Sequence, residues 1–251
     1  MLEKDWDRLA KKKEYLADVI SPFAYKSSAE IIEKEIRRFA NKNKTAIDLG
    51  TGLGILVPFL SRNFREVFAI DYSSGMVDFA KQHNKHLKNA VFEKMNMLDM
   101  PYKNKFDAAI AINSIIAPSI KSVTKIIKNI HKLLKKNGTL IAVLPSLEAI
   151  LYCAMLVNEK KLKTYSEKTA RKKTRQVIEG WCYDFLLGFM KEGKEVQKHF
   201  YDFEIEYRLK KAGFKDIEIK KIHYPWKVLE DKDRNFPGEE PVWDWLVVAR
   251  K

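Results

Sequence analysis

The strongest constraint on the fold is the regular alternation of short β-rich runs and amphipathic helical segments between Thr45 and Ser146. Strand-like runs such as TAIDLG, EVFAID and FDAAIAINS are each followed by a helical pattern, for example SSGMVDFAKQHNKHL. Strands that are separated by helices pair in parallel through right-handed crossovers, and ligands bind at the carboxyl ends of such strands. The pattern therefore predicts an α/β fold with a doubly wound parallel sheet.

The clearest helical pattern follows the fourth strand-like run, in SIKSVTKIIKNIHKLLKKNG. Ile120, Val123, Ile127, Ile130 and Leu134 recur at spacings of three or four, which predicts one apolar stripe facing the sheet. The hydroxyl of the preceding serine can cap the start of this helix. Gly138 is expected to take the left-handed position at its carboxyl end.

The size and composition of the chain are those of a single-domain enzyme. With 251 residues, of which 46% are hydrophobic, it can bury one full core, and we predict one domain over residues 1–251. The N-terminus is charged from its third residue, and the longest apolar run, Ala149–Val157, is far shorter than the roughly 20 residues that cross a bilayer. We expect no signal peptide, no membrane partner and a cytoplasmic location. Cys153 and Cys182 form no CxxC or metal-ligand cluster, so we predict no metal site.

Two segments lie outside the alternating pattern. Residues 1–42 have apolar positions at helical spacing, and we predict a helical N-terminal lid over the cofactor, or simply a cover for the edge of the sheet. Residues 147–201 contain two helical patterns and a hairpin that turns at Glu192–Gly193. An insertion after the fifth strand lies at the carboxyl edge of the sheet, so we predict that this segment is a substrate cap. A further helix and the runs FKDIEIKKIHY and VWDWLVVARK complete the pattern.

A glycine-rich loop, DLGTGLG (residues 48–54), connects the first strand with the helix that follows. Glycines let the backbone adopt unusual dihedral angles and approach a ligand closely, and the N-terminus of a helix attracts a carboxylate or phosphate. A P-loop would require Gly-Lys-Ser or Gly-Lys-Thr, which is absent, and the dinucleotide fingerprint G-x-G-x-x-G differs from the G-x-G-x-G of this loop. The spacing therefore argues against NAD as the ligand.

An acidic residue, Asp71, ends the second strand about 20 residues beyond the loop. A carboxylate at this position can accept hydrogen bonds from both hydroxyls of a ribose. Tyr72 and Met76 follow it and can supply an apolar face for an adenine. The alternative role for Asp71 is that of N-cap for the next helix, a role that Ser73 can also fill. Because the loop and the acid occur together at this spacing, the pattern favours an adenosine-bearing ligand.

In their order and spacing, these motifs resemble those of the class I S-adenosylmethionine-dependent methyltransferases. AIDLGTGLG resembles the first motif of that family, VFAIDYSSGMVDFAKQ the second, and FEKMNMLDMPYKNKFDAAIAINSI the third and fourth. LLKKNGTLIAVLPS resembles the turn and fifth strand, so the likeness runs from about Thr45 to Ser146 and continues more loosely to Lys251. The resemblance implies a Rossmann-like, seven-stranded sheet, mostly parallel with the last strand antiparallel. It also implies S-adenosyl-L-methionine as the cofactor, which becomes S-adenosyl-L-homocysteine.

The resemblance also implies where the cofactor would lie. The loop would shape its methionine end, Asp71 would hold the ribose, and the stretch from Asn96 to Leu98 would lie against the adenine. Many members of the family have aspartate where this chain has Asn96, but an amide oxygen can still accept from the adenine amine. Asn96 can alternatively be a loop residue that satisfies its own backbone. The predicted cofactor-binding residues are Asp48, Gly50, Thr51, Gly52, Gly54, Asp71, Tyr72, Met76, Asn96, Met97, Leu98, Asn113 and Ser114, of which the last two would lie near the transferred methyl group.

Methyl transfer from a sulfonium is an in-line displacement, so orienting the nucleophile can supply much of the acceleration without a dedicated base. The fourth strand ends in NSIIAP and lacks the Asn/Asp-Pro-Pro-aromatic signature of enzymes that methylate amino groups of adenine, cytosine or glutamine. Four residues remain as candidates for a general base: His199, Tyr201, His223 and Tyr224.

The net charge of +14 makes a polyanionic partner worth considering, and eight basic residues against one acidic residue lie between Lys160 and Arg175. However, the chain has 37 lysines and 10 arginines, whereas recognition of phosphate and base edges favours arginine. We therefore predict methylation of a small molecule. The alternatives are an RNA methyltransferase that uses residues 160–175, and a catalytically silent S-adenosylmethionine-binding subunit that activates a partner.

Overall fold

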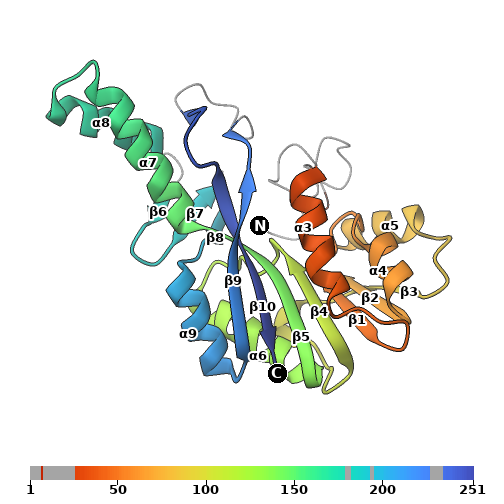
Figure 1. Ribbon diagram of the computed structural model, residues 1–251. Helices are drawn as coiled ribbons and strands as arrows, with labels where there is room; N and C mark the ends of the chain where they lie inside the picture. Colours follow the sequence, from red (N-terminus) through yellow and green to blue (C-terminus); the bar gives the residue numbers. More distant parts are fainter. Residues whose placement is uncertain (1–6, 8–25, 179–181, 193–194, 227–233) are drawn as a thin grey trace.

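A seven-stranded sheet forms the centre of the computed structural model, which describes residue 7 and residues 26–178, 182–192, 195–226 and 234–251 (Figure 1). The strand order is β3-β2-β1-β4-β5-β10-β9. Neighbouring strands are parallel except at β10, which is antiparallel to both β5 and β9. This confirms the predicted fold, including the antiparallel last strand. The strands are β1 (Thr45–Leu49), β2 (Glu66–Asp71), β3 (Ala90–Lys94), β4 (Phe106–Ile112), β5 (Leu134–Pro145), β9 (Lys215–Tyr224) and β10 (Val242–Arg250).

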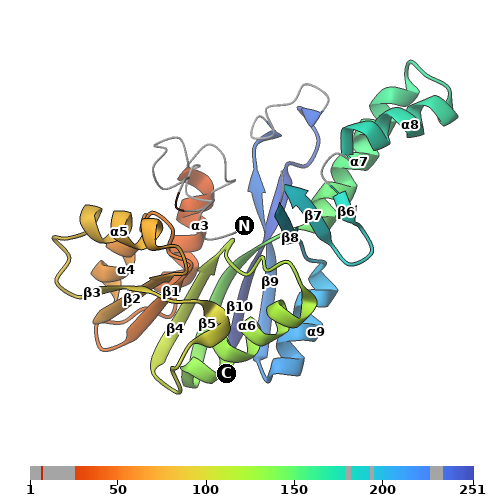
Figure 2. The ribbon, with the colours of Figure 1, turned by 180° about the vertical axis from the view of Figure 1, so that it is seen from behind.

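Helices cover both faces of the sheet (Figures 1 and 2). One face is covered by α3 (Lys26–Arg37), α4 (Val57–Asn63) and α5 (Ser74–His83), and the other by α6 (Ile120–Leu133) and α9 (Asp202–Ala212). All five residues of β1 are buried, as expected for a central parallel strand that is covered on both sides. The core therefore lies in two layers, one on each face of the sheet.

Helix α6 shows where local sequence signals hold and where they fail. Val123, Ile127 and Ile130 of its predicted stripe are buried, whereas Ile120 is half-buried and Leu134 lies beyond the helix. The Ser119 hydroxyl accepts a hydrogen bond from the backbone N–H of Ser122 (3.1 Å). The prediction for Gly138 is wrong, because the helix ends at Leu133 and β5 begins with the next residue. The left-handed residue of this region is Asn137, at φ 62°, and it lies within β5 rather than at the end of the helix. The Lys251 ammonium donates to the carbonyl of Leu134 (2.7 Å), one of the carbonyls at the end of the helix that have no partner within the helix.

The segment from residue 147 to residue 201 forms a separate layer at the carboxyl edge of the sheet. Helices α7 (Leu147–Leu162) and α8 (Glu167–Ile178) pack side by side and project beyond the sheet (Figures 1 and 2). They are followed by a small antiparallel sheet of β6 (Cys182–Asp184), β7 (Phe189–Glu192) and β8 (Glu195–Lys198). The predicted hairpin is present as the β7–β8 pair, although its turn at residues 193–194 lies outside the described residues.

Helix α3 packs against β9, the strand at one edge of the sheet. Ile32 and Ile36 are fully buried, and the Ser28 hydroxyl donates to the carbonyl of His223 in β9 (3.1 Å). This part of the predicted N-terminal lid thus covers the sheet. Its remaining residues lie outside the described part of the chain, apart from Asp7.

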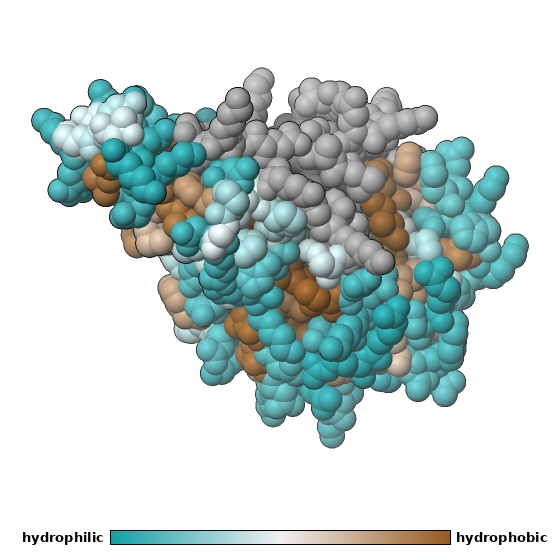
Figure 3. Space-filling view, turned by 45° about the horizontal axis from the view of Figure 1, so that its top comes forward, coloured by the Kyte–Doolittle hydropathy of each residue, from teal (hydrophilic) through white to brown (hydrophobic). Residues whose placement is uncertain are grey.

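The face shown in Figure 3 is mostly hydrophilic, with apolar side chains exposed along the projecting α7–α8 hairpin. Within the described residues, we find no helix with the length and apolar character needed to cross a membrane.

Candidate cofactor and acceptor site

The glycine-rich loop lies where the strand order of the sheet reverses, between β1 and β4. Gly50, Gly52 and Gly54 all have left-handed backbone angles, with φ values of 73°, 51° and 74°. A Cβ atom on Gly50 would lie 2.5 Å from Cβ of Ser114, and one on Gly54 would lie 2.8 Å from Cβ of Ala80. A Cβ on Gly52 would have nothing within 4 Å. The outer two glycines therefore permit close packing, whereas Gly52 leaves open space in which a ligand can approach the backbone.

Asp71, at the end of β2, forms a hydrogen bond to the glycine-rich loop. Its Oδ2 accepts a hydrogen bond from the backbone N–H of Gly52 and its Oδ1 accepts one from the N–H of Ser73, both at 3.0 Å. Burial raises the pKa of the Asp71 carboxyl, and these backbone donors oppose the rise. The backbone of Tyr72 also bonds this carboxylate, and the acceptor capacity that remains suits a ribose hydroxyl. The N-cap of α5 is Ser73, whose hydroxyl accepts from the N–H of Met76 (3.2 Å).

A second buried carboxylate, Asp48, stiffens the loop from inside. The Thr51 hydroxyl donates to Oδ2 of Asp48 (2.7 Å), and Asp48 is only 3% exposed. Burial raises the pKa of Asp48 to about 7, with a smaller contribution from the nearby charge of Asp71. Asp48 therefore shapes the loop through Thr51.

Asp7 is a residue of this site that the sequence did not reveal. Its Oδ1 accepts a hydrogen bond from the Ser73 hydroxyl (2.5 Å) and one from the backbone N–H of Gly75 (2.9 Å) at the start of α5. Its charge also contributes to the raised pKa of Asp71. Acidic side chains are favoured at helix N-termini, but this one comes from a segment that is remote in the chain, and no local pattern marks it.

The predicted adenine side is formed by residues of α5 and of the 3-10 helix η2 (Met97–Asp99). Tyr72 is half-buried and Met76 is fully buried. The Asn96 side chain caps η2, because its Oδ1 accepts from the N–H of Leu98 (2.9 Å). The Asn129 amide of α6 donates to the carbonyls of Met97 and Leu98 (2.9 and 3.0 Å). Asn96 thus bonds the backbone of its own loop, which is the alternative role considered from the sequence. Contact between this segment and an adenine stays a prediction.

A polar cluster occupies the carboxyl ends of β4, β5 and β9. The Asn113 side-chain amide and the Tyr224 hydroxyl both donate to Oδ2 of Asp244, at 3.2 and 3.1 Å, and the backbone N–H of Ser146 donates to Oδ1 (3.2 Å). Desolvation raises the pKa of Asp244 to about 6 and that of Tyr224 well above its usual value. Sequence reasoning missed Asp244, although an acidic residue inside the apolar run VWDWLVV was a usable signal.

The four candidate bases lie in different surroundings. His199 is near the polar cluster, bonded to the backbone of Ser146, and burial together with the charge of Lys198 lowers its pKa to about 4. The Tyr201 hydroxyl donates to the carbonyl of Phe185 (3.1 Å). His223 contacts Glu240 (3.0 Å) and is 41% exposed, on the opposite side of β9 from Tyr224. Tyr224 thus shares an oxygen of Asp244 with Asn113, and His199 bonds the backbone of Ser146 in the same cluster, whereas His223 points away from it.

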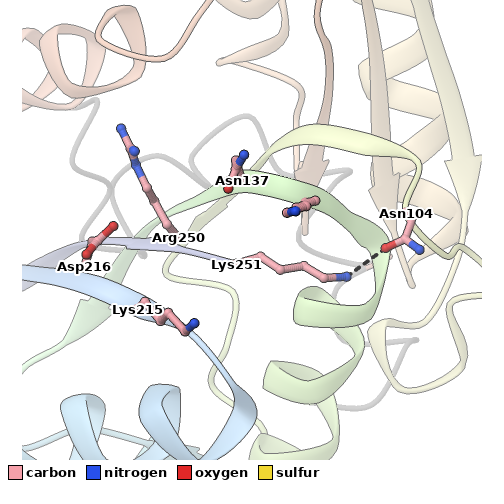
Figure 4. A pocket seen from close by; sticks show the side chains of 7 residues that line it. Asn104, Asn137, Lys215, Asp216, Arg250 and Lys251 are labelled. Carbon is pink, nitrogen blue, oxygen red and sulfur yellow. Dashed lines mark hydrogen bonds between the residues drawn. The ribbon is translucent and has the colours of Figure 1, made fainter.

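A cavity of about 590 Å³ lies at the other end of the sheet, near the amino ends of β4 and β5 (Figure 4). Lys251 donates to Oδ1 of Asn104 there (2.9 Å), and the splayed side chains of Lys215 and Arg250 do not point to a common centre. This cavity is separate from the glycine loop and from the polar cluster. Its lining residues are Asn104, Lys136, Asn137, Lys215, Asp216, Arg250 and Lys251.

Comparison with known proteins identifies the class of this domain. A family described as a methyltransferase domain matches residues 40–213, which is more than half of the chain. The chain belongs to this family of methyltransferase domains.

Individual relatives agree with this assignment. The ubiquinone biosynthesis O-methyltransferase of Pelagibacter ubique is 35% identical over 98 residues, and the match spans 39% of this chain and 40% of that protein. The N-methyltransferase NodS of Bradyrhizobium japonicum, solved with S-adenosyl-L-homocysteine, has a TM-score of 0.62 at 11% identity and covers 99% of this chain and 97% of its own. A methyltransferase of Haloferax volcanii, solved in complex with the Trm112 methyltransferase activator, has a TM-score of 0.62 at 16% identity, with coverage of 98% and 96%.

The domain is therefore a S-adenosyl-L-methionine-dependent methyltransferase domain, and its own geometry fits that cofactor. Gly52 leaves open backbone at the loop, and Asp71 presents two anchored carboxylate oxygens beside it. The Ser114 hydroxyl is buried, and within the described residues it has no hydrogen-bond partner. A buried donor of this kind, next to Gly50, is satisfied when a polar ligand group occupies the site.

Proposed function

We propose that this protein is a S-adenosyl-L-methionine-dependent methyltransferase that methylates a small molecule bound at the carboxyl edge of the sheet, beneath the cap of residues 147–201. The observation that carries this proposal is the attachment of the cap to the strands that hold the polar cluster. The N–H of Phe200 donates to the carbonyl of Pro145 (2.8 Å), the N–H of Leu147 donates to the carbonyl of Phe200 (3.0 Å), and Lys198 N–H donates to the carbonyl of Ile116 (3.3 Å). Both ends of the cap thus meet beside Asn113 and Ser114.

The chemistry requires positioning more than acid–base catalysis. When bound, S-adenosyl-L-methionine supplies a methyl group whose carbon–sulfur bond breaks as a lone pair of the acceptor bonds to the carbon, leaving S-adenosyl-L-homocysteine. Asp71 and the loop would hold the cofactor, and Asn113 would orient the acceptor for in-line attack. Among the groups near the acceptor, His199 is neutral at physiological pH because its pKa is about 4, so it can accept a hydrogen bond from an acceptor hydroxyl or amine.

The related proteins support a small acceptor. One relative carries the name of an O-methyltransferase of ubiquinone biosynthesis and one structural neighbour that of an N-methyltransferase. Both names are compatible with a hydroxyl or amine nucleophile on a small molecule, which is the acceptor class we propose.

An RNA acceptor is the first alternative, and the character of the α7–α8 hairpin argues against it. Its basic segment lies beside exposed apolar side chains of α7, namely Leu151, Met155 and Leu162, which are 39%, 51% and 37% exposed. These residues share one face of the helix, and Met155 and Leu162 line a surface pocket together with Arg171 and Arg175 of α8. A surface for a phosphate backbone would be polar and cationic throughout.

The second alternative, a silent activating subunit, has one observation in its favour, because a structural neighbour is a methyltransferase in complex with an activator. That neighbour is the methyltransferase and not the activator. The glycine loop, Asp71 and the polar cluster of this chain are also intact, which favours an active enzyme.

The first test is calorimetric titration with S-adenosyl-L-homocysteine, with NADH as the control ligand. We expect binding of S-adenosyl-L-homocysteine in the micromolar range, no binding of NADH, and loss of binding in Asp71→Ala. Unchanged affinity in that variant would contradict the site.

The second test is transfer of a labelled methyl group to panels of phenols, catechols, amines and total RNA. Transfer to a phenol, catechol or amine supports the proposal. Transfer to RNA alone, with steep salt dependence, would replace it. Cofactor binding without transfer to any acceptor would favour the silent subunit.

A further inference from the structure

One carboxylate, that of Asp244, organises the polar cluster at the carboxyl edge. Oδ2 accepts from Nδ2 of Asn113, which directly follows β4 (3.2 Å), and from the hydroxyl of Tyr224 on β9 (3.1 Å). Oδ1 accepts from the backbone N–H of Ser146 at the end of β5 (3.2 Å). A residue of β10 thereby joins three other strands at one point, between the cap and the glycine loop.

Only an ionised carboxylate can accept from all three donors at once. Asparagine at position 244 would place an NH₂ group against either the Ser146 N–H or the Asn113 amide, so at least one donor would lose its acceptor. The carboxylate also fixes the orientation of the Asn113 amide, because the reversed orientation would place the amide oxygen against a carboxylate oxygen.

Asn113 links this carboxylate to the cofactor side of the site. It has a left-handed φ of 48°, which costs energy for a residue other than glycine, although asparagine tolerates it better than most. The next residue, Ser114, packs directly on Gly50, where an added Cβ would lie 2.5 Å from Cβ of Ser114. The backbone N–H of Asn113 donates to the carbonyl of Val143 (2.9 Å). Two hydrogen bonds therefore hold this strained residue between the loop and β10.

We propose that Asp244 is a positioning residue of the acceptor site, which holds the Asn113 amide in the arrangement that receives the acceptor. This inference rests on the proposed function and adds a residue to it. Asp244 acts through Asn113 and is not itself a group that touches the reacting atoms. Tyr224 serves as a fixed hydrogen-bond donor to Asp244 rather than as a general base, because its hydroxyl keeps its proton and directs it at Oδ2 of Asp244.

The kinetic test compares Asp244→Asn with a matched control, Asp107→Asn. Asp107 lies near the amino end of β4, the strand that Asn113 follows, and its Oδ2 likewise accepts from a backbone N–H, that of Thr45 (2.9 Å), and also from the Lys135 ammonium (2.8 Å). With an acceptor found in the small-molecule panel, we expect Asp244→Asn to lower kcat/KM for that acceptor by roughly 100-fold while the affinity for S-adenosyl-L-homocysteine changes less than about threefold. Asp107→Asn should leave both unchanged.

A double-variant comparison separates positioning from general structural damage. If Asp244 acts through Asn113, then Asp244→Asn should reduce activity by less than about twofold in an Asn113→Ala background, because the group that it orients is already absent. Independent, multiplicative losses would overturn the proposal. So would equal losses in cofactor affinity and in acceptor turnover, since those indicate a disrupted fold.

A spectroscopic test needs no acceptor and so separates this proposal from the proposed function. The side-chain amide signals of Asn113 in a ¹⁵N–¹H spectrum can be assigned by their absence in Asn113→Ala. We expect Asp244→Asn to displace these signals and Asp107→Asn to leave them in place. Unmoved signals in Asp244→Asn would overturn the proposal even if methyl transfer is found. If Asp244→Asn does not fold, Tyr224→Phe replaces it, because loss of the second donor to Oδ2 should also displace the Asn113 signals.

Discussion

At the scale of single residues, the glycine-rich loop depends on backbone geometry that few side chains permit. Gly50 and Gly52 are both left-handed, but only Gly50 is in close contact with another residue, Ser114. The two glycines therefore have different functions, and substitution by alanine can tell them apart.

Gly50→Ala should reduce stability, and Gly52→Ala should reduce cofactor binding more than stability. The left-handed backbone costs alanine about 1–2 kcal/mol at either position, and at position 50 the contact with Ser114 adds to this. We expect urea denaturation to show the larger loss for Gly50→Ala. Calorimetry should show at least about tenfold weaker S-adenosyl-L-homocysteine binding for folded Gly52→Ala. Wild-type affinity in Gly52→Ala would mean that the ligand does not approach this backbone.

The stability of the folded protein should depend on pH through Asp48. Its pKa of about 7 is raised above the usual value by burial, so the folded state holds this proton more tightly than the unfolded chain. The resulting stabilisation is fully present below about pH 4 and is lost as the pH rises through 7, by at most about 4 kcal/mol. The free energy of unfolding, measured in urea between pH 5 and pH 8, should fall less steeply in Asp48→Asn. Parallel curves for the two proteins would contradict the assignment.

At the scale of elements, the sequence predicted what depends on local spacing. The short β-rich runs between helical patterns predicted the strands, and Ser119 correctly predicted the start of α6. The end of that helix was missed because Leu134 pairs with β4, a contact between distant segments that overrides the local signal of Gly138. The contacts of Asp7 with Ser73 and of Asp244 with Asn113 escaped for the same reason, since each joins residues more than sixty positions apart. The glycine loop and Asp71 were recognisable because their chemistry is confined to a short motif.

The junction between β8 and α9 contains a buried ion pair whose loss should be costly. Lys198 is fully buried, and its ammonium donates to Oε2 of Glu204 (2.6 Å), while Arg208 contacts Oε1 of the same carboxylate (2.8 Å). Glu204→Gln leaves the buried ammonium without its counter-charge and should lower the free energy of unfolding by about 3–5 kcal/mol. The double variant Lys198→Met, Glu204→Gln should be less destabilised, as measured by urea denaturation. An equal loss in both would argue that Glu204 acts through Arg208 alone.

At the scale of the whole molecule, the sheet gathers the cofactor loop, the polar cluster and the base of the cap at one edge. Ligand binding at that edge should therefore stabilise the protein as a unit. S-adenosyl-L-homocysteine at about 100 times its Kd should add about 2.7 kcal/mol to the free energy of unfolding. For a chain of this size, that corresponds to a rise in Tm of roughly 5–10 °C in a calorimetric scan. NADH at the same concentration should leave Tm unchanged, and a similar rise with both ligands would contradict a specific site.

The position of β10 has a consequence for how the protein is made. This strand pairs on both sides with strands that precede it, β5 and β9, and it carries Asp244. While residues 242–250 are still inside the ribosome, β5 and β9 each lack the strand that lies between them in the finished sheet. The hydrogen-bond donors of Asn113, Ser146 and Tyr224 also lack Asp244, their common acceptor. Insertion of β10 closes the sheet and supplies Asp244 in one step, so under the proposed function we expect methyl transfer only after the fold is finished.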